Sequence, residues 1–324
     1  MTKIDDMGAE LRAQYDDDMW LGHLVWYYVP ADFQITLKDW MTAIYGTPVK
    51  DLVPNAPRPV DAFKRAINKT KGSVKVPMPS LGEFTYKFLP RDRGHDGEHV
   101  YRSITVEELD SANHRLSYET CVNFAYDRKT ERIEKPEFDK GALSTFPAAI
   151  QQLCETKAAQ VQAGYLEEMD SLGPIKVREL IRQDVERKMM GTLARPSGGV
   201  YFVSNEWIDR IDGLDEMVNG LNGPTFHQLP LINSSKQREM LRAAFEVEAA
   251  GQVEILMEEM RLLLKGKKGK ITQLKAKQYH GRFLEMTDRL GAYSDLLNEG
   301  METTAVQLKA LQTQCMEVFK RIED

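Results

Sequence analysis

The spacing of apolar residues over 235–324 predicts a long helical hairpin. Two apolar series advance in steps of three and four, the first from Tyr279 to Leu297 and the second from Leu308 to Ile322. Such steps place the side chains on one stripe of an α-helix, which forms the seam of a coiled coil. We therefore expect one helix over 234–264 and a second over 271–322, joined by a lysine-rich tip.

The second predicted helix is longer than its partner. At 1.5 Å per residue it would extend ~75 Å and overhang the first helix, so its end must pack on the helix predicted over 146–172 or on another copy. We favour a second copy, because heptad seams commonly join identical chains. A break at Gly300 would instead fold the last segment back, since glycine costs a helix interior ~1 kcal/mol relative to alanine. The predicted interface residues are Leu297, Met301, Leu308, Leu311, Cys315, Val318 and Ile322.

Alternation of polar and apolar residues predicts an antiparallel meander in the first half of the chain. A buried aromatic strand that stops at Pro30 precedes it. The expected strands cover 23–29, 84–91, 99–109, 115–126 and 131–138, and the expected early helices cover 35–46 and 60–69.

Helical periodicity dominates the rest of the chain, with two short strands between helices. The expected helices cover 146–172, 175–190 and 206–221, and the strands cover 198–203 and 225–232. The fold class is therefore α+β: an antiparallel sheet with flanking helices, a smaller strand-helix unit and a long terminal helical hairpin. We expect domains at 1–145, 146–234 and 235–324.

A weak internal repeat, which we call the internal echo, supports the hypothesis of a duplication. Strand 23–29 and strand 198–203 are both aromatic, and each precedes a helix and a proline-containing loop. A duplication would pair these two strands around a pseudo-twofold axis. The alternative is that a strand followed by a helix is common in any α+β protein.

Composition bears on whether the protein spans a membrane and on the cellular compartment in which it is expected. With 42% hydrophobic residues, 28% charged residues and no apolar run of ~20 residues, the chain has no predicted membrane span. The start of the chain lacks the basic and apolar segments of a secretory signal. The three cysteines, Cys121, Cys154 and Cys315, are odd in number and far apart in sequence, so we do not expect disulfides. Their absence predicts a cytoplasmic location.

The lysine-rich tip is the main candidate for anion contact. The residues that would contact phosphate are Lys265, Lys267, Lys268, Lys270, Lys275 and Lys277. A solvated turn whose lysines complement a helix end is the favoured interpretation, and nucleic acid remains the alternative. A net charge of −6 argues against nucleic-acid binding by the chain as a whole. The Walker A spacing is absent, because Gly266 stands only three residues before Gly269.

No catalytic, metal or cofactor site is predicted. His95 and His99 lie on a glycine-rich hairpin tip, where metal ligands would be exposed to water. The paired acids Glu107-Glu108, Glu167-Glu168 and Glu258-Glu259 are interpreted as solubilising surface. The turn at 195–199 lacks the glycine pattern of a dinucleotide site.

One resemblance adds to this picture. The segment Arg195-Pro-Ser-Gly-Gly-Val-Tyr-Phe-Val203, the segment 226–231 and a long helix starting near Arg238 resemble an uncharacterised family of proteins encoded by phages and prokaryotic mobile elements. The resemblance implies a setting in bacteria or phage-infected cells and no particular activity.

These observations predict a non-enzymatic interaction or assembly protein without a cofactor, which forms homo-oligomers through its terminal hairpin and contacts other proteins. The alternative is a nucleic-acid accessory protein that contacts phosphate through the lysine-rich tip.

Overall fold

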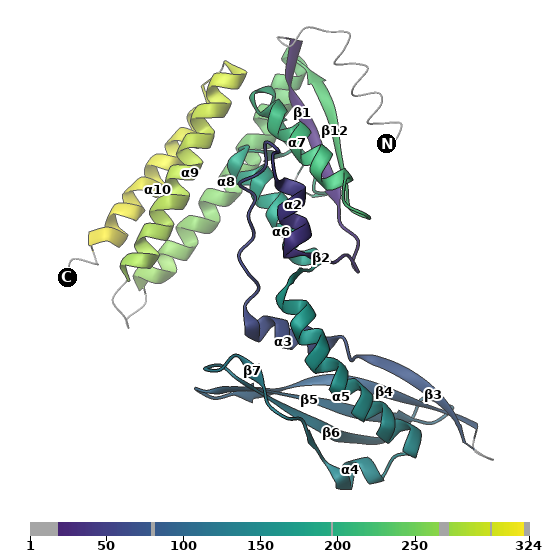
Figure 1. The fold of residues 1–324 in the computed structure, drawn as a ribbon. Coiled ribbons are helices and arrows are strands. Elements are labelled where there is room, and N and C mark those ends of the chain that lie inside the picture. The colour runs from purple at the N-terminus through teal and green to yellow at the C-terminus, as the bar shows by residue number, and fades with distance from the viewer. Residues whose placement is uncertain (1–18, 79–81, 196, 266–271, 299, 321–324) are drawn as a thin grey trace. The chain divides into compact units, whose positions relative to one another are not determined.

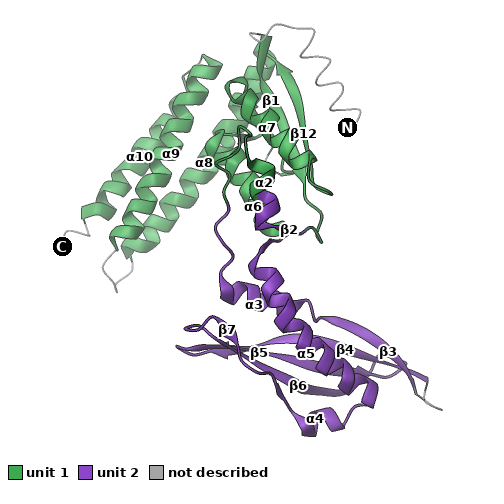
Figure 2. Cartoon of the chain, in the orientation of Figure 1, with its two compact units in different colours: residues 1–33, 41–53, 174–324 green, residues 34–40, 54–173 purple. Residues whose placement is uncertain are grey.

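The computed structural model describes residues 19–78, 82–195, 197–265, 272–298 and 300–320 (Figure 1). The chain divides into two compact units, and each is built from separated segments (Figure 2). Unit 1 comprises residues 1–33, 41–53 and 174–324, and unit 2 comprises residues 34–40 and 54–173. The predicted division at 145 and 234 differs from this one, because the first strand of the chain pairs with strands that lie beyond residue 190.

Unit 1 contains a four-stranded antiparallel sheet in the order β10-β11-β1-β12. The central strand β1 (Trp20–Tyr28) pairs with β11 (Tyr201–Ser204) on one side and with β12 (Thr225–Ile232) on the other. The short β10 (Thr192–Leu193) completes the sheet. The two aromatic strands of the internal echo are thus paired, as the duplication hypothesis expects.

Gly22 allows the close approach of β1 and β11. A Cβ atom at this position would lie 2.2 Å from the Val203 carbonyl oxygen and 2.7 Å from the Phe202 ring. Real Cβ atoms do not approach backbone oxygen this closely, so the register leaves space for glycine alone. The same arrangement directs Leu21 and Phe202 into a core shared with the terminal helices.

The terminal region is a bundle of three helices: α8 (Ser235–Lys265), α9 (Gln273–Leu297) and α10 (Glu302–Lys320) (Figure 1). The predicted helix over 234–264 and the hairpin are confirmed, but the prediction of one continuous helix over 271–322 is wrong. Asn298 caps α9 in the left-handed conformation at φ 53°, and α10 then folds back against both α8 and α9. The break falls beside Gly300, where the glycine and the stutter weaken the helix.

Shorter helices precede and separate the strands of the unit 1 sheet along the chain. Helix α6 (Pro174–Gln183) continues as the π-helical segment η2 (Asp184–Lys188), so the helix predicted over 175–190 is observed with a π-helical end. The 3₁₀ turn η3 (Asn205–Trp207) leads into α7 (Ile208–Asn219), which packs along β12. Helix α2 (Leu37–Ile44) crosses the boundary between the units.

Unit 2 is an antiparallel sheet with helices on one face. Its strands follow the path β3-β4-β5-β6-β7, and β8 also pairs with β6. Helices α3 and α5 pack on the face that carries Tyr86, Phe88 and Ile104. The strands are β3 (Gly72–Met78), β4 (Gly82–His95), β5 (His99–Leu109), β6 (Arg115–Asp127), β7 (Arg132–Ile133) and β8 (Glu137–Phe138), and the helices are α3 (Pro59–Asn68), α4 (Lys140–Ser144) and α5 (Ala148–Met169).

The meander is confirmed with two changes, and a separate small sheet adds to it. Strand β3 was not predicted, since Pro77 interrupts its short alternation, yet it pairs with β4 from Gly72 to Met78. The single strand predicted over 131–138 is two short strands separated at Glu134, Lys135 and Pro136. A further two-residue pair joins β2 (Ile35–Thr36) to β9 (Ser171–Leu172).

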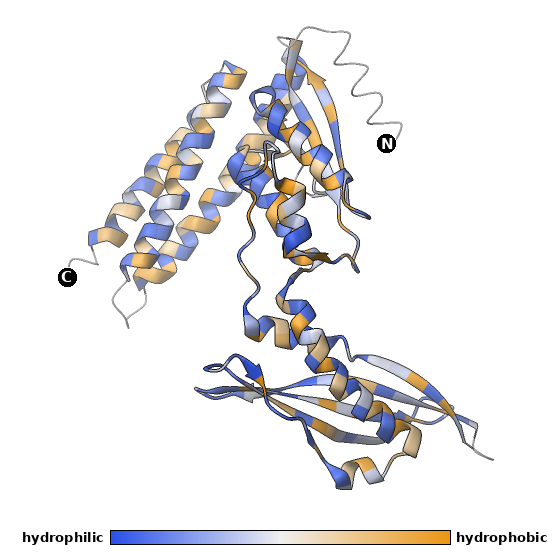
Figure 3. Cartoon of the chain, viewed as in Figure 1, coloured by the Kyte–Doolittle hydropathy of each residue, from blue (hydrophilic) through white to orange (hydrophobic). Residues whose placement is uncertain are grey.

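Hydrophobic and hydrophilic residues alternate along most helices and strands (Figure 3). This pattern is expected for elements that bury one face and expose the other. The α+β class with antiparallel sheets and a terminal helical hairpin is therefore observed. Within the described ranges, none of the helices is both long and apolar enough to cross a membrane.

Candidate functional site

The lysine-rich tip lies mostly outside the described residues. Lys267, Lys268 and Lys270 belong to the segment that the structure does not describe. Lys265 ends α8, and Lys275 and Lys277 lie in the first turns of α9, all three with exposed side chains. Phosphate contact at this tip stays a prediction.

The predicted interface residues lie inside the bundle. They are Leu297, Met301, Leu308, Leu311, Cys315 and Val318, each no more than 5% exposed, while Ile322 lies outside the described residues. From Leu308 to Val318 they pack with Val253, Leu256 and Met260 of α8, and Leu297 and Met301 pack with Phe245. The heptad seam is thus filled by residues of the same chain, and its burial requires no second copy.

A different apolar surface of the bundle is exposed. Met240, Val247, Ile255 and Leu262 of α8 have between 45% and 61% of their surface exposed. We call these four residues the α8 stripe. They lie eleven and four residues before, and four and eleven residues after, Gly251. Because these offsets are close to whole helical turns, all five positions share one face of the helix.

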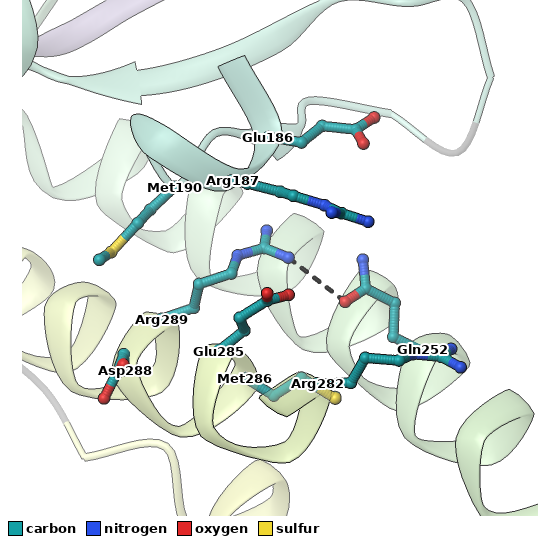
Figure 4. A pocket seen from close by; sticks show the side chains of 9 residues that line it. All are labelled: Glu186, Arg187, Met190, Gln252, Arg282, Glu285, Met286, Asp288 and Arg289. Atoms are coloured by element: carbon teal, nitrogen blue, oxygen red, sulfur yellow. Dashed lines mark hydrogen bonds between the residues drawn. The ribbon is translucent and has the colours of Figure 1, made fainter. Parts of the chain in front are cut away.

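A pocket of about 360 Å³ lies between η2, α8 and α9 of unit 1 (Figure 4). Its charged lining consists of three arginines and three acids: Arg187, Arg282, Arg289, Glu186, Glu285 and Asp288. The remaining lining residues are methionines and a glutamine, so the pocket offers no nucleophile with a neighbouring general base. π-helical segments such as η2 are frequent at functional sites.

Arg289, which lines this pocket, is held in place by hydrogen bonds to neighbouring elements. Its Nη2 donates to Glu248 Oε1 at 3.0 Å, to Thr192 Oγ1 at 2.9 Å and to the Gly191 carbonyl at 3.1 Å. Its Nη1 donates to Gln252 Oε1 at 3.3 Å, the bond drawn in Figure 4. The guanidinium therefore ties α9 to α8 and to the sheet, and its charge is already neutralised by Glu248.

Two cysteines that are distant in sequence are neighbours in unit 2. Cys121 on β6 and Cys154 on α5 are fully buried in the same core cluster, where their thiols interact. This interaction and burial raise the pKa of the Cys121 thiol. All three cysteines are free, and Cys121 and Cys154, which are far apart in sequence, share one core.

Glu168 is not the surface acid that the sequence predicted. It is 2% exposed, and its carboxylate contacts Arg65 Nε at 2.5 Å and Lys69 Nζ at 2.6 Å. Gln34 Nε2 donates to the same carboxylate at 2.8 Å. Burial raises the pKa of Glu168, but the bonds from Lys69 and Arg65 outweigh it and hold the pKa below its usual range.

We expect Glu168→Gln to loosen the packing of α3 on α5. The amide keeps the shape but loses the charge-assisted bonds, so the free energy of local opening should fall by about 1–3 kcal/mol at neutral pH. Because the pKa is lower in the folded chain, this contribution is present above pH ~4.3 and is lost as the pH falls through the folded pKa. Hydrogen exchange at α3 and α5 measures it. Equal exchange in the wild type and the variant at pH 7 would contradict the prediction.

His95 and His99 form no metal site. Within the described part of the chain, no group of three or more His, Cys, Asp or Glu side chains is arranged to hold a metal ion. His99 instead contacts Glu134 at 3.1 Å and stacks near Tyr101. These contacts place it on the polar face of the unit 2 sheet.

Comparison with known proteins places the chain in a family. No curated protein and no solved structure matches it. The model of the family of unknown function DUF6744 matches residues 20–324. Because the match covers nearly the whole chain, the protein belongs to the DUF6744 family.

Proposed function

We propose that this protein is a non-enzymatic assembly protein that forms a symmetric dimer through the α8 stripe. The observation that carries the proposal is the symmetric placement of four exposed apolar residues around Gly251. If two α8 helices cross antiparallel at Gly251, Val247 faces Ile255 of the second copy and Met240 faces Leu262 of the second copy. An isologous twofold interface requires such self-matching positions.

Gly251 suits the centre of such a crossing. No atom lies within 4 Å of the position that its Cβ would take, so the space in front of it is open. A second helix can therefore approach the backbone closely, as small residues permit at helix crossings. Ala244, one of the small residues of this face, adds no bulk there.

Glu258, the acid closest to the axis of the stripe, is already neutralised. Glu258 accepts bonds of 2.6 and 2.8 Å from Arg261, and this pairing lowers the pKa of Glu258. In the antiparallel arrangement Glu258 faces Ala244 of the second copy, which leaves room for the ion pair. Glu258 can therefore be covered as part of an ion pair. Glu254, which is exposed, is rotated about 60° from Gly251 around the helix axis and lies at the edge of the stripe.

The expected dimer is of moderate affinity. Eight partly exposed side chains from two copies contribute on the order of 10 kcal/mol when they are buried. The loss of translational and rotational freedom offsets a large part of this gain. We expect a dissociation constant in the micromolar range, about −8 kcal/mol.

Size-exclusion chromatography with light scattering tests the proposal. At about 10–100 µM the wild type should elute as a dimer, and Val247→Glu/Ile255→Glu should elute as a folded monomer, because two buried carboxylates cost several kcal/mol. The matched control is Val306→Glu/Met316→Glu on α10, whose side chains are 68% and 58% exposed and lie off the stripe. A wild-type monomer over this range, or loss of the dimer in the control alone, would overturn the proposal.

We also propose that the protein acts in the cytoplasm of bacterial or phage-infected cells. Three free, buried thiols agree with a reducing compartment. The resemblance of segments 195–203 and 226–231 to phage-encoded proteins supports the phage setting.

A further inference from the structure

The second candidate surface is the face of the unit 2 sheet opposite to α3 and α5. Strand alternation places one set of side chains in the helix-covered core, with Tyr86 and Phe88 among them, and the other set on the opposite face. We call the basic and aromatic residues of this second set the arginine face. It consists of Lys87, Arg91, Arg93, Tyr101, Arg115 and Tyr118.

Two arginines on this face have unused hydrogen-bonding capacity. Arg91 Nε donates to the Tyr118 hydroxyl at 2.7 Å, and Arg93 Nη2 donates to Thr120 Oγ1 at 2.9 Å. Both side chains are exposed, and neither pairs with a carboxylate among the described residues. Since a guanidinium has five N–H donors, each arginine can still bind an anion.

Exposed aromatic rings lie among these cations. The Tyr118 ring is 40% exposed, with the Arg91 and Arg115 guanidinium carbons 5.7 and 5.1 Å from its centroid. Tyr101, 36% exposed, lies on the next strand. The Tyr118 ring, held between two arginines, and the neighbouring Tyr101 ring, which stacks near His99, form a platform on which a base can stack.

Basic residues continue from this platform in two directions. One hollow of about 320 Å³ is lined by Arg91 together with Lys71. A second of about 360 Å³ is lined by Arg93 together with Tyr101 and Lys135. The two hollows therefore place cations on both sides of the Arg91–Arg93 pair.

Acidic residues limit the face without cancelling its charge. Glu107 contacts Arg115 at 2.6 Å and Lys87 at 3.8 Å, so its charge is neutralised within the sheet. Glu134 and Glu137 line the hollow beside Lys135, on the side of β7 and β8. The free positive charge is concentrated at Arg91 and Arg93.

A buried hydroxyl of the same face also lacks a partner. Ser103 pairs across the strands with Arg91, is 0% exposed, and its Oγ makes no hydrogen bond in the described structure. Buried polar atoms are usually satisfied, and exceptions concentrate where a site is incomplete. A buried hydroxyl without a partner, directly across the strands from Arg91, supports a ligand with hydrogen-bonding groups at this face.

We propose that the arginine face binds single-stranded nucleic acid, with Arg91 and Arg93 contacting phosphates and Tyr118 and Tyr101 stacking on bases. Stacking requires unpaired bases, which a duplex does not present. The platform is also small, whereas duplex binding relies on many cationic contacts that a chain of net charge −6 does not offer. This inference is independent of the α8 stripe, which lies in the other unit.

Fluorescence anisotropy of a labelled oligodeoxythymidine of about 20 nucleotides tests this proposal. The wild type should bind with a salt-dependent affinity between about 50 and 200 mM salt. Arg91→Gln/Arg93→Gln should weaken binding at least tenfold and flatten the slope of log K against log salt by about 1.4, for two lost contacts to a single strand. Tyr118→Leu should weaken binding about tenfold and leave the slope nearly unchanged.

Matched variants separate this face from other basic surfaces. Arg178→Gln/Arg182→Gln removes two exposed arginines of α6 in unit 1 and should bind like the wild type. Lys265→Glu/Lys275→Glu/Lys277→Glu tests the lysine-rich tip and should also retain binding. Circular dichroism checks that each variant is folded. No binding by the wild type, an equal loss in the unit 1 control, or loss only in the lysine variant would each overturn the proposal.

Discussion

A chain truncated after Asn298 is expected to lose the folded terminal bundle. Such a truncation removes α10, whose Leu308, Leu311, Cys315 and Val318 are at most 5% exposed and fill the groove between α8 and α9. Each large apolar side chain contributes about 1.5–3 kcal/mol on burial, so the total approaches the whole stability of a domain. Removal also exposes Leu256 and Met260 of α8 to water.

Circular dichroism and size-exclusion chromatography measure this outcome. The truncated chain should lose helical signal beyond that of the deleted residues, and it should aggregate. A chain ending at Lys320 is the matched control, because it retains all of α10. The point variant Leu311→Ala should lower the free energy of unfolding by about 2–5 kcal/mol. A soluble, fully helical product ending at Asn298 would contradict the three-helix arrangement.

Replacing Arg210 by Met is expected to destabilise unit 1 by about 3–5 kcal/mol. Arg210 is 9% exposed on α7 and contacts Asp184 of η2 at 2.5 Å and Asp51 at 2.7 Å. Its Nη1 also donates to the Pro48 carbonyl at 3.0 Å. Removing the guanidinium would leave Asp184, which is 4% exposed, as an uncompensated buried carboxylate.

The pKa directions agree with this network. Burial raises the pKa of Asp184 despite its bonds to Arg210. Burial also acts to raise the pKa of Asp51, but the bonds from Arg210 and Lys188 outweigh it and lower that pKa. Asp184 therefore depends on the arginine to remain charged.

Urea unfolding of matched variants measures the contribution of Arg210. Lys188→Met removes a second cation near Asp51, but this pair is about half exposed at 3.3 Å and should cost less than about 1 kcal/mol. Asp184→Leu/Arg210→Met should recover much of the loss, because both members of the buried pair are replaced by apolar groups. A loss below about 1 kcal/mol in Arg210→Met would show that the network contributes little.

Local patterns were sufficient to predict most elements. The 3.6-residue period located α5 and α8, and the two-residue period located β4, β5 and β6. Both periodicities depend only on residues within one element, so they can be read from the sequence without knowledge of tertiary contacts. The chain reversal at Asn298 was harder to predict, because Gly300 and the stutter permitted a break without requiring one.

Features that depend on distant partners were not predicted. The sequence predicts a surface position for Glu168, because its partners Arg65 and Lys69 lie about a hundred residues earlier in the chain. The arginine face was missed for the same reason: alternation turns Arg91 and Arg93 to the polar face, but only the register brings them to Tyr118 and Thr120. The outward alternation of basic residues in β4 was the signal available in the sequence.

The α8 stripe was hidden by a stronger signal. The buried face and the exposed face of α8 both carry apolar residues, so its overall amphipathicity is weak, whereas α9 and α10 carry a clear heptad seam. The structure shows which apolar residues of α8 are buried and which are exposed. Only the exposed ones are placed symmetrically about Gly251, so the sequence alone does not reveal the stripe.

Cysteine cross-linking of full-length protein tests the antiparallel α8 dimer most directly. A residue on the twofold axis meets its own copy, so Gly251→Cys should form a disulfide-linked dimer under mild oxidation. Met240→Cys alone should not, because its two copies would lie on the order of 30 Å apart, whereas an equal mixture of Met240→Cys and Leu262→Cys should cross-link. The native cysteines are buried and give little background. Failure of Gly251→Cys, or efficient self-linking of Met240→Cys, would contradict the proposed assembly.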